Sequence, residues 1–257
     1  MTIRAVIFDL DGTLVQTERL KAYSYAKALQ ELSADPIMEE KIIDAFKDVV
    51  GLSRREVAQG LLVRFQLEEQ ARSRMEDFGV QTPWQAFIQI RLQFYEQMLS
   101  EPQSILTNTW PHNMLLLEEV KKAGCRIGLA TMSYCPQVNR VLDILNLGTT
   151  FDFVASRDDV ENGKPDPEIY KMVACELDVP VEDCLVIEDS PTGVKAALAA
   201  GMHVIAVTTP FTKAAFSKNK LIDERWIVND PESLPQIVKQ LMSENSSEGW
   251  TSLHIIN

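Results

Sequence analysis

A short apolar segment that runs directly into two carboxylates constrains this chain more than any other feature. Residues 5–8 are apolar or small and rich in strand formers, which predicts a short buried strand. Asp9 and Asp11 follow two apart, so on an extended strand both would share one face, where like charges repel. A divalent cation such as Mg²⁺, which prefers oxygen ligands, removes that cost, and Gly12 allows a sharp backbone turn. The alternative is an edge strand entering an Asp-Gly hairpin.

The second half of the chain alternates between strand and helix patterns. Strands are expected at 126–130, 151–155, 184–187, 204–207 and 226–228. Helices are expected at 113–123, 137–146, 167–177, 192–200 and 232–242. Strands that alternate with helices predict an α/β fold, a Rossmann-like parallel sheet with helices on both faces.

An all-helical block interrupts this pattern. From about residue 15 to 100 the apolar residues recur at helical spacing with no strand-like alternation, and Thr82-Pro83 looks like the start of a long helix. We expect residues 16–104 to form an inserted helical cap domain. The core domain would then comprise residues 1–15 and 105–243. Residues 244–257 form a C-terminal tail that either frays or docks as a strand.

Composition narrows the classes of partner. The 257 residues carry a net charge of −12, which argues against nucleic acid or an anionic membrane as the main partner. No apolar run reaches the ~20 residues of a membrane helix, and the N-terminus enters a strand without a signal-peptide pattern. The four cysteines and three histidines show no zinc-like spacing. We expect a cytoplasmic protein with reduced thiols, a monomer or weak dimer, that acts on a small molecule.

Polar residues at the predicted strand ends are the candidate site, because ligands bind beyond the carboxyl ends of parallel strands. Thr131 follows the strand at 126–130, and its hydroxyl could bind a phosphate oxygen or simply cap the next helix. Ser133 is close enough in the sequence to assist. Lys164, fixed between Gly163 and Pro165, could neutralise a phosphate or remain a solvated loop residue.

Two consecutive acids end the strand predicted at 184–187. Glu188 and Asp189 are followed by a helix start, and two negative charges at a buried strand end again favour a bound cation. The alternative is that Asp189 caps the helix that follows.

These segments together resemble the haloacid dehalogenase superfamily. The four motifs of that family are matched in order by Asp9-Leu10-Asp11-Gly12-Thr13, Thr131, Gly163-Lys164-Pro165-Asp166-Pro167 and Glu188-Asp189-Ser190-Pro191-Thr192-Gly193. The resemblance covers about residues 4–209, and the helical block lies where one branch of the superfamily carries its cap.

The resemblance implies a Mg²⁺-dependent phosphoryl transfer from a small phosphorylated metabolite. Asp9 would attack phosphorus and become an aspartyl phosphate, and Asp11 would act as general acid and base. Thr131 and Lys164 would hold the phosphoryl oxygens. The Mg²⁺ ligands implied are a carboxylate oxygen of Asp9, the backbone carbonyl of Asp11, and Asp189, with Glu188 bound directly or through water. Because members that cleave carbon–halogen or carbon–phosphorus bonds lack an acid at the position of Asp11, the resemblance favours a phosphatase or phosphomutase.

The cap would supply substrate specificity. Residues 51–56 read as the end of one helix at Gly51 and a capping box at the start of the next, but they also resemble the specificity loop of β-phosphoglucomutases, with Arg54 at the position that grips a distal phosphate. Lys21 falls where those mutases have a cap histidine and is a second candidate contact. Tyr134 and Cys135 replace a mutase Lys and Asn. We therefore expect a phosphatase, possibly for a sugar phosphate; a mutase is the alternative, and a non-catalytic phosphate-binding module is a distant third.

Overall fold

The computed structural model describes residues 3–49, 52–218 and 221–244. Its sheet has six strands in the order β3-β2-β1-β4-β5-β6, and every neighbouring pair is parallel. The strands are β1 (Ala5–Phe8), β2 (Arg126–Ala130), β3 (Phe153–Ala155), β4 (Cys184–Glu188), β5 (His203–Val207) and β6 (Ile227–Val228). The predicted α/β fold is confirmed. The hairpin alternative for β1 is wrong, because β1 pairs in parallel with β2 on one side and β4 on the other.

Contacts between residues divide the chain into two compact units. The first unit comprises Met1–Gln16 and Ile105–Asn257 and holds the sheet, and the second comprises Thr17–Ser104. Each is described by itself below, as the core unit and the helical unit. The part of the chain predicted to be a cap thus folds compactly on its own contacts, while its role as a cap stays a prediction.

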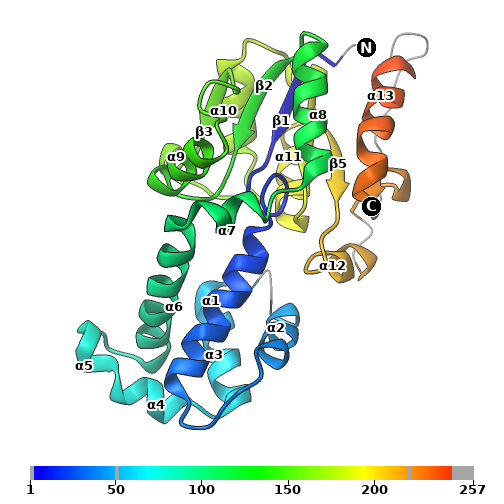
Figure 1. Ribbon diagram of the computed structural model, residues 1–257. Coiled ribbons are helices and arrows are strands. Elements are labelled where there is room, and N and C mark those ends of the chain that lie inside the picture. Colours follow the sequence, from blue (N-terminus) through cyan, green and yellow to red (C-terminus); the bar gives the residue numbers. More distant parts are fainter. Residues whose placement is uncertain (1–2, 50–51, 219–220, 245–257) are drawn as a thin grey trace. The chain divides into compact units, whose positions relative to one another are not determined.

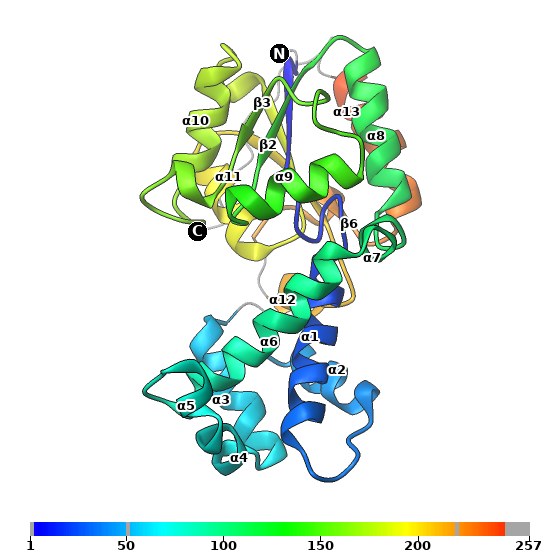
Figure 2. The same ribbon diagram turned by 60° about the vertical axis from the view of Figure 1, so that its left-hand side comes forward.

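In the core unit, helices cover both faces of the sheet. They are α8 (Pro111–Lys122), α9 (Cys135–Ile144), α10 (Glu168–Glu176), α11 (Pro191–Ala199) and α13 (Leu234–Glu244). The short helix α12 (Lys213–Lys218) lies beyond the carboxyl end of β5 (Figure 1). Ala5 and Ile7 of β1 pack into one apolar cluster with residues of α10 and α11. Val6 and Phe8 are also fully buried and, by the alternation of a strand, point to the opposite face. Figure 2 shows α10 and α8 on opposite sides of the sheet.

This double burial explains the apolar runs of the strands. A parallel sheet covered on both faces needs apolar residues at successive positions instead of alternate ones. Ala5 to Phe8 and Leu185 to Ile187 show no exposure. The sheet is also closely covered: at Gly128 in β2, a Cβ atom would lie 2.4 Å from Val173 of α10, so the glycine lets this helix approach the strand.

The helical unit contains no strand among its described residues. It consists of α1 (Thr17–Leu32), α2 (Glu39–Lys47), α3 (Arg54–Phe65), α4 (Glu68–Ser73), α5 (Met75–Phe78) and α6 (Pro83–Ser100) (Figure 1). The short helix α7 (Pro102–Leu106) follows α6 in the chain, and the division between the two units falls within it. Thr82 and Pro83 start α6 as predicted. Ser53 and Glu56 form the expected capping box of α3, with both of its hydrogen bonds present.

Some element boundaries differ from the sequence-based expectation. The strand predicted at 151–155 begins only at Phe153, because the Asp152 carboxylate accepts a hydrogen bond from the Ile127 backbone N–H. The short helix α12 was not predicted. The helix end expected at Gly51 lies outside the described residues, as does the tail from residue 245 onward. None of the described helices is both long enough and apolar enough to cross a bilayer.

Candidate active site

The candidate site begins where β1 ends. The Asp9 backbone N–H donates to the Ile187 carbonyl at 3.0 Å, which continues the β1–β4 ladder by one residue and leaves Asp9 buried at the strand end. The chain then turns at Gly12, whose φ of +89° is rarely adopted by residues with a side chain, as expected from the sequence. The Gly12 N–H donates to the Val15 carbonyl at 2.7 Å and closes the turn.

Asp11 faces the end of β2. One oxygen of its carboxylate, Oδ2, accepts hydrogen bonds from the hydroxyl groups of Thr131 at 3.0 Å and Ser133 at 2.6 Å. Thr131 is fully buried, and its backbone N–H continues the ladder to Ala155 of β3. The structure therefore brings together three of the predicted residues from two neighbouring strand ends.

Lys164 lies at the centre of the site. Its ammonium group donates to Asp9 Oδ1 at 2.7 Å, to Glu188 Oε1 at 2.7 Å and to the Ala130 carbonyl at 3.0 Å, which accounts for its three hydrogens. Its side chain is only 5% exposed. The alternative of a solvated loop lysine is therefore wrong, and this cation ties three strand ends together.

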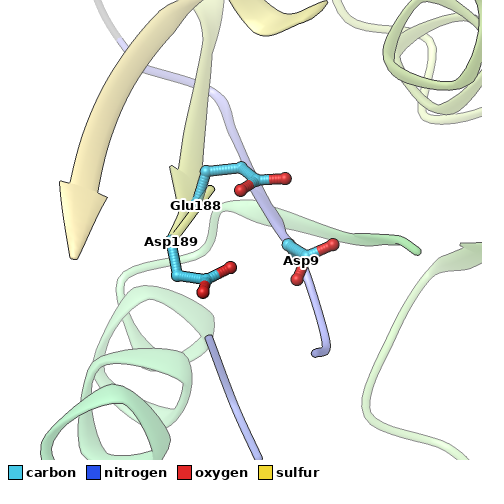
Figure 3. Close-up of side chains that lie close together, drawn as sticks. All are labelled: Asp9, Glu188 and Asp189. Atoms are coloured by element: carbon cyan, nitrogen blue, oxygen red, sulfur yellow. The ribbon is translucent and has the colours of Figure 1, made fainter. Parts of the chain in front are cut away.

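Asp9, Glu188 and Asp189 form a buried acidic cluster. Each offers an oxygen within 4.8 Å of the others' oxygens, and Figure 3 shows their side chains gathered at the ends of β1 and β4. Three carboxylates at that spacing are the hard-oxygen donor set that suits a divalent cation such as Mg²⁺. The predicted alternative that Asp189 caps α11 is wrong, since the N-cap is Ser190, whose hydroxyl accepts the Gly193 N–H.

The charge balance within the cluster also favours a bound divalent cation. Burial raises the pKa of Asp9 well above its usual value; Lys164 opposes this, while Glu188 and Asp11 add to it. Burial disfavours the charged form of Lys164, but the carboxylates of Asp9 and Glu188 prevail and raise its pKa. One ammonium thus faces several acids in a buried place, and a divalent cation would favour the ionised form of Asp9.

The other two predicted contacts, Lys21 and Arg54, meet in the helical unit. They line a pocket of about 250 Å³ together with Glu18, Tyr25, Phe46, Leu52, Val57 and Arg91. Lys21 forms an ion pair with Glu18 at 3.7 Å, and Arg54 is exposed. Three cations against one acid make this pocket suitable for an anionic group.

Arg91 was missed by the sequence analysis. It is 5% exposed, forms no ion pair within the described part of the chain, and its Nε has no hydrogen-bond partner there. Its guanidinium carbon lies 4.3 Å from the ring centroid of Tyr95 and 5.1 Å from that of Tyr25, an arrangement that favours a cation. The available signal was a charge on the apolar face of α6, next to Phe87 and Ile90.

One further prediction concerns Thr131. The helix that follows β2 starts at Cys135 with Tyr134 as N-cap, so the alternative that Thr131 caps this helix is wrong.

The second residue that the sequence analysis missed is Tyr170 in α10, whose hydroxyl donates to Glu188 Oε1 at 3.0 Å. No sequence motif marks it, because its helical position reads as an ordinary core residue.

Comparison with known proteins places this site in a family. The haloacid dehalogenase-like hydrolase family matches residues 6–207, which include every candidate site residue described above. The chain belongs to this family of hydrolases. The four sequence motifs led us to expect a member of this family, and the match confirms that expectation.

Individual relatives cover both of the activities expected. The phosphorylated carbohydrates phosphatase of Thermotoga maritima is 30% identical over 203 residues, 79% of this chain and 84% of that protein. The structure of a candidate β-phosphoglucomutase from the same organism superimposes with a TM-score of 0.67 and 28% identity, covering 93% of this chain and 99% of that one. Suppressor of Quenching 1, a chloroplastic protein of Arabidopsis thaliana, is 30% identical over 213 residues, and this chain spans only 18% of it.

Proposed function

We propose that this protein hydrolyses a small phosphomonoester through a covalent aspartyl phosphate on Asp9. The observation that carries the proposal is that two acids two residues apart sit in different environments. Asp9 is buried against the Lys164 ammonium, whereas Asp11 accepts hydrogen bonds from two hydroxyl groups. Neighbouring carboxylates held in different environments can divide the roles of nucleophile and general acid between them.

The proposed reaction uses the chain's own groups at each step. A carboxylate oxygen of Asp9 attacks phosphorus, and Asp11 protonates the departing oxygen of the ester. Asp11 then removes a proton from water, which attacks the phosphorus of the aspartyl phosphate and releases inorganic phosphate. Thr131, Ser133 and Lys164 would supply hydroxyl and ammonium donors to the phosphoryl oxygens, in exchange for hydrogen bonds that they now donate to Asp11 and Asp9. The covalent intermediate divides one difficult displacement into two easier ones.

We propose Mg²⁺ as the cofactor of this site. Asp9, Asp189 and the backbone carbonyl of Asp11 would hold it, with Glu188 nearby, and the buried acidic cluster supports this assignment. When bound, the ion neutralises charge that develops on the transferring phosphoryl group. The −12 net charge argues against nucleic acid or an anionic membrane as a partner, and an anionic substrate would rely on the local cations of the site. We propose a small phosphorylated metabolite as substrate, a cytoplasmic location, and a monomer or weak dimer.

The proposed substrate is a phosphorylated carbohydrate or a similar small ester with a second polar or anionic group. The similarity to the phosphorylated carbohydrates phosphatase of Thermotoga maritima supports a phosphorylated carbohydrate. The cationic pocket of the helical unit supports the second polar or anionic group, and we assign Lys21, Arg54 and Arg91 as contacts of the substrate's non-reacting end. The helical unit would then serve as a specificity cap.

The test is phosphate release by the purified protein with Mg²⁺, across sugar phosphates, nucleotides and short-chain phosphate esters. Asp9→Asn keeps the shape of the side chain and removes the nucleophile. Asp143→Asn, on the outer helix α9, is the matched control. Release by the wild type and the control, but not by Asp9→Asn, is the expected result. Equal release by all three proteins would contradict the proposal.

A second candidate is a β-phosphoglucomutase-type phosphomutase. Two observations favour it: the similarity in structure to the candidate β-phosphoglucomutase of Thermotoga maritima, and the presence of Arg54 in the pocket. The substitutions at Tyr134 and Cys135 weaken it. Conversion of β-glucose 1-phosphate to glucose 6-phosphate in the presence of a bisphosphate primer, without net phosphate release, would select the mutase over the phosphatase. Mg²⁺ binding without either reaction would select the non-catalytic module.

A further inference from the structure

Glu188 occupies a place in the acidic cluster unlike that of its neighbours. Its carboxylate accepts four hydrogen bonds. Lys164 Nζ and the Tyr170 hydroxyl donate to Oε1 at 2.7 and 3.0 Å, and the backbone N–H and hydroxyl of Ser190 donate to Oε2 at 2.8 and 3.0 Å. A carboxylate has about four lone-pair sites. All of them are therefore engaged, and a direct bond from Glu188 to a metal ion would require one of these donors to leave.

Tyr170 packs its ring in the apolar core and donates its hydroxyl hydrogen to Glu188. Its side chain is completely buried, and its ring centroid lies 4.8 Å from Lys164 Nζ, so the same residue touches both members of the Lys164–Glu188 ion pair. Burial raises the pKa of Tyr170 well above its usual value, which keeps the hydroxyl protonated and able to donate. Ser190, in contrast, also caps α11.

The space around Glu188 is fixed as well. A Cβ atom at Gly193 would lie 1.7 Å from Glu188 Oε1, so α11 leaves room for this carboxylate only because residue 193 is glycine. Glu188 itself is 1% exposed. Packing and hydrogen bonds thus agree on one orientation of the carboxylate, the one that serves Lys164.

We propose that Tyr170 is a positioning residue that holds Glu188 on Lys164 and keeps its carboxylate out of direct coordination of the cation. The inference rests on the proposed function, since it assumes the metal site. Asp9 and Asp189 would then provide the direct carboxylate ligands. Limiting the number of protein oxygens favours Mg²⁺, which retains several waters, over Ca²⁺, which takes six to eight oxygen ligands.

Tyr170→Phe tests this with the full-length chain. The substitution keeps the ring, its packing and its contact with Lys164, and it removes one hydrogen bond to Glu188. We expect the ratio of the dissociation constants for Ca²⁺ and Mg²⁺, measured calorimetrically on the protein alone, to shift about tenfold toward Ca²⁺. We also expect kcat with Mg²⁺ to fall about tenfold while KM changes less than twofold. This is a typical effect of losing a residue that orients the groups around a metal ion by hydrogen bonding to them.

Two further variants separate positioning from a general structural role. In a Glu188→Gln background, Tyr170→Phe should change neither the metal preference nor kcat further, because Tyr170 acts through the Glu188 carboxylate. Tyr23→Phe, which removes a tyrosine hydroxyl in the helical unit, is the matched control and should resemble the wild type. Thermal unfolding monitored by circular dichroism verifies that each variant is folded.

The outcomes distinguish the inference from the function beneath it. A wild type that binds Mg²⁺ and releases phosphate, with a folded Tyr170→Phe variant of unchanged metal preference and kcat, overturns the inference alone. The same conclusion follows if Tyr170→Phe has its full effect in the Glu188→Gln background. A wild type that neither binds Mg²⁺ nor releases phosphate overturns the proposed function, and the inference falls with it.

Discussion

The two charged sites of this molecule are built in opposite ways. In the core unit, the Lys164 ammonium has a partner for each of its three hydrogens, and two of those partners are carboxylates. In the helical unit, Arg91 is as deeply buried but has no ion pair among the described residues and rests between two tyrosine rings. A closed network fixes reacting groups in place, whereas an open cationic pocket is completed by an arriving anion. Under the proposed function, the core would carry out the chemistry and the helical pocket would select the substrate.

Metal removal should have the largest effect and should concern the core site alone. Chelation is expected to abolish phosphate release, and added Mg²⁺ to restore it, because the phosphoryl charge loses its counter-ion. Mg²⁺ at about 100 times its dissociation constant should also stabilise the fold by about 2.7 kcal/mol, measured as a rise in Tm. Asp189→Asn should lose both responses, and Arg54→Ala should retain both. Undiminished release after chelation would contradict the metal assignment.

Replacing the cation at the centre of the core should be the next largest change. Lys164→Met is expected to lower kcat about 10²–10³-fold, as is typical when a preorganised charged donor is lost. It should also destabilise the fold by about 3–5 kcal/mol, because Asp9 and Glu188 are left buried without their counter-charge. Steady-state kinetics and urea unfolding measure the two effects. Lys122→Met, on the exposed side of α8, is the matched control and should change neither.

The buried cation of the helical unit should respond in the opposite sense. Arg91→Met keeps most of the side-chain volume and removes a charge that forms no ion pair with any residue the structure describes, so Tm should stay the same or rise. KM for the substrate should increase about tenfold at unchanged kcat, because a charged contact to the non-reacting end is lost. A loss of stability like that of Lys164→Met would erase the distinction between the two sites.

Arg54 permits a sharper test with an internal control. Arg54→Ala should raise KM several-fold, about 1 kcal/mol of binding, without affecting turnover. The next residue, Arg55, is equally exposed but lies against the Trp84 ring and does not line the pocket, so Arg55→Ala should leave KM unchanged. Equal effects of the two substitutions would indicate a general electrostatic influence instead of a specific contact.

The smallest expected effect comes from the capping box that directly precedes Arg54. Ser53→Ala removes the capping box at the start of α3, directly before Arg54, and should cost about 1 kcal/mol of stability. A slight increase in KM with unchanged kcat is expected, because the first turn of α3 becomes less ordered. A change in kcat larger than the change in KM would contradict the separation of roles.

The sequence revealed the core site better than the helical pocket for a physical reason. Buried strands must be apolar, so Asp9, Glu188 and Asp189 stood out as charges where the sheet tolerates none. Lys164 needed the resemblance, because a lysine beside glycine and proline otherwise reads as a loop residue. The parallel order of the strands followed from the alternation of strand and helix, although the start of β3 did not, since it depends on a hydrogen bond that the Asp152 side chain accepts.

The residues that were missed depend on tertiary contacts. Arg91 lies on the apolar face of an ordinary amphipathic helix, and nothing local indicates that two tyrosines, one of them in α1, enclose it. Tyr170 reads as a core aromatic, and its role depends on a carboxylate 18 residues away. Motifs identify the groups that react, whereas the groups that orient or select are fixed by packing between elements.

The most direct test of the central claim is to look for the phosphoryl group on Asp9. The wild type would be mixed with a radiolabelled phosphate ester that it hydrolyses, quenched in acid within one turnover, digested and analysed by mass spectrometry. Label on the peptide that contains Asp9, absent from the Asp9→Asn protein, is the predicted result. Phosphate release by the wild type with no phosphorylated peptide at any quench time, and equal release by Asp9→Asn, would contradict a covalent role for Asp9.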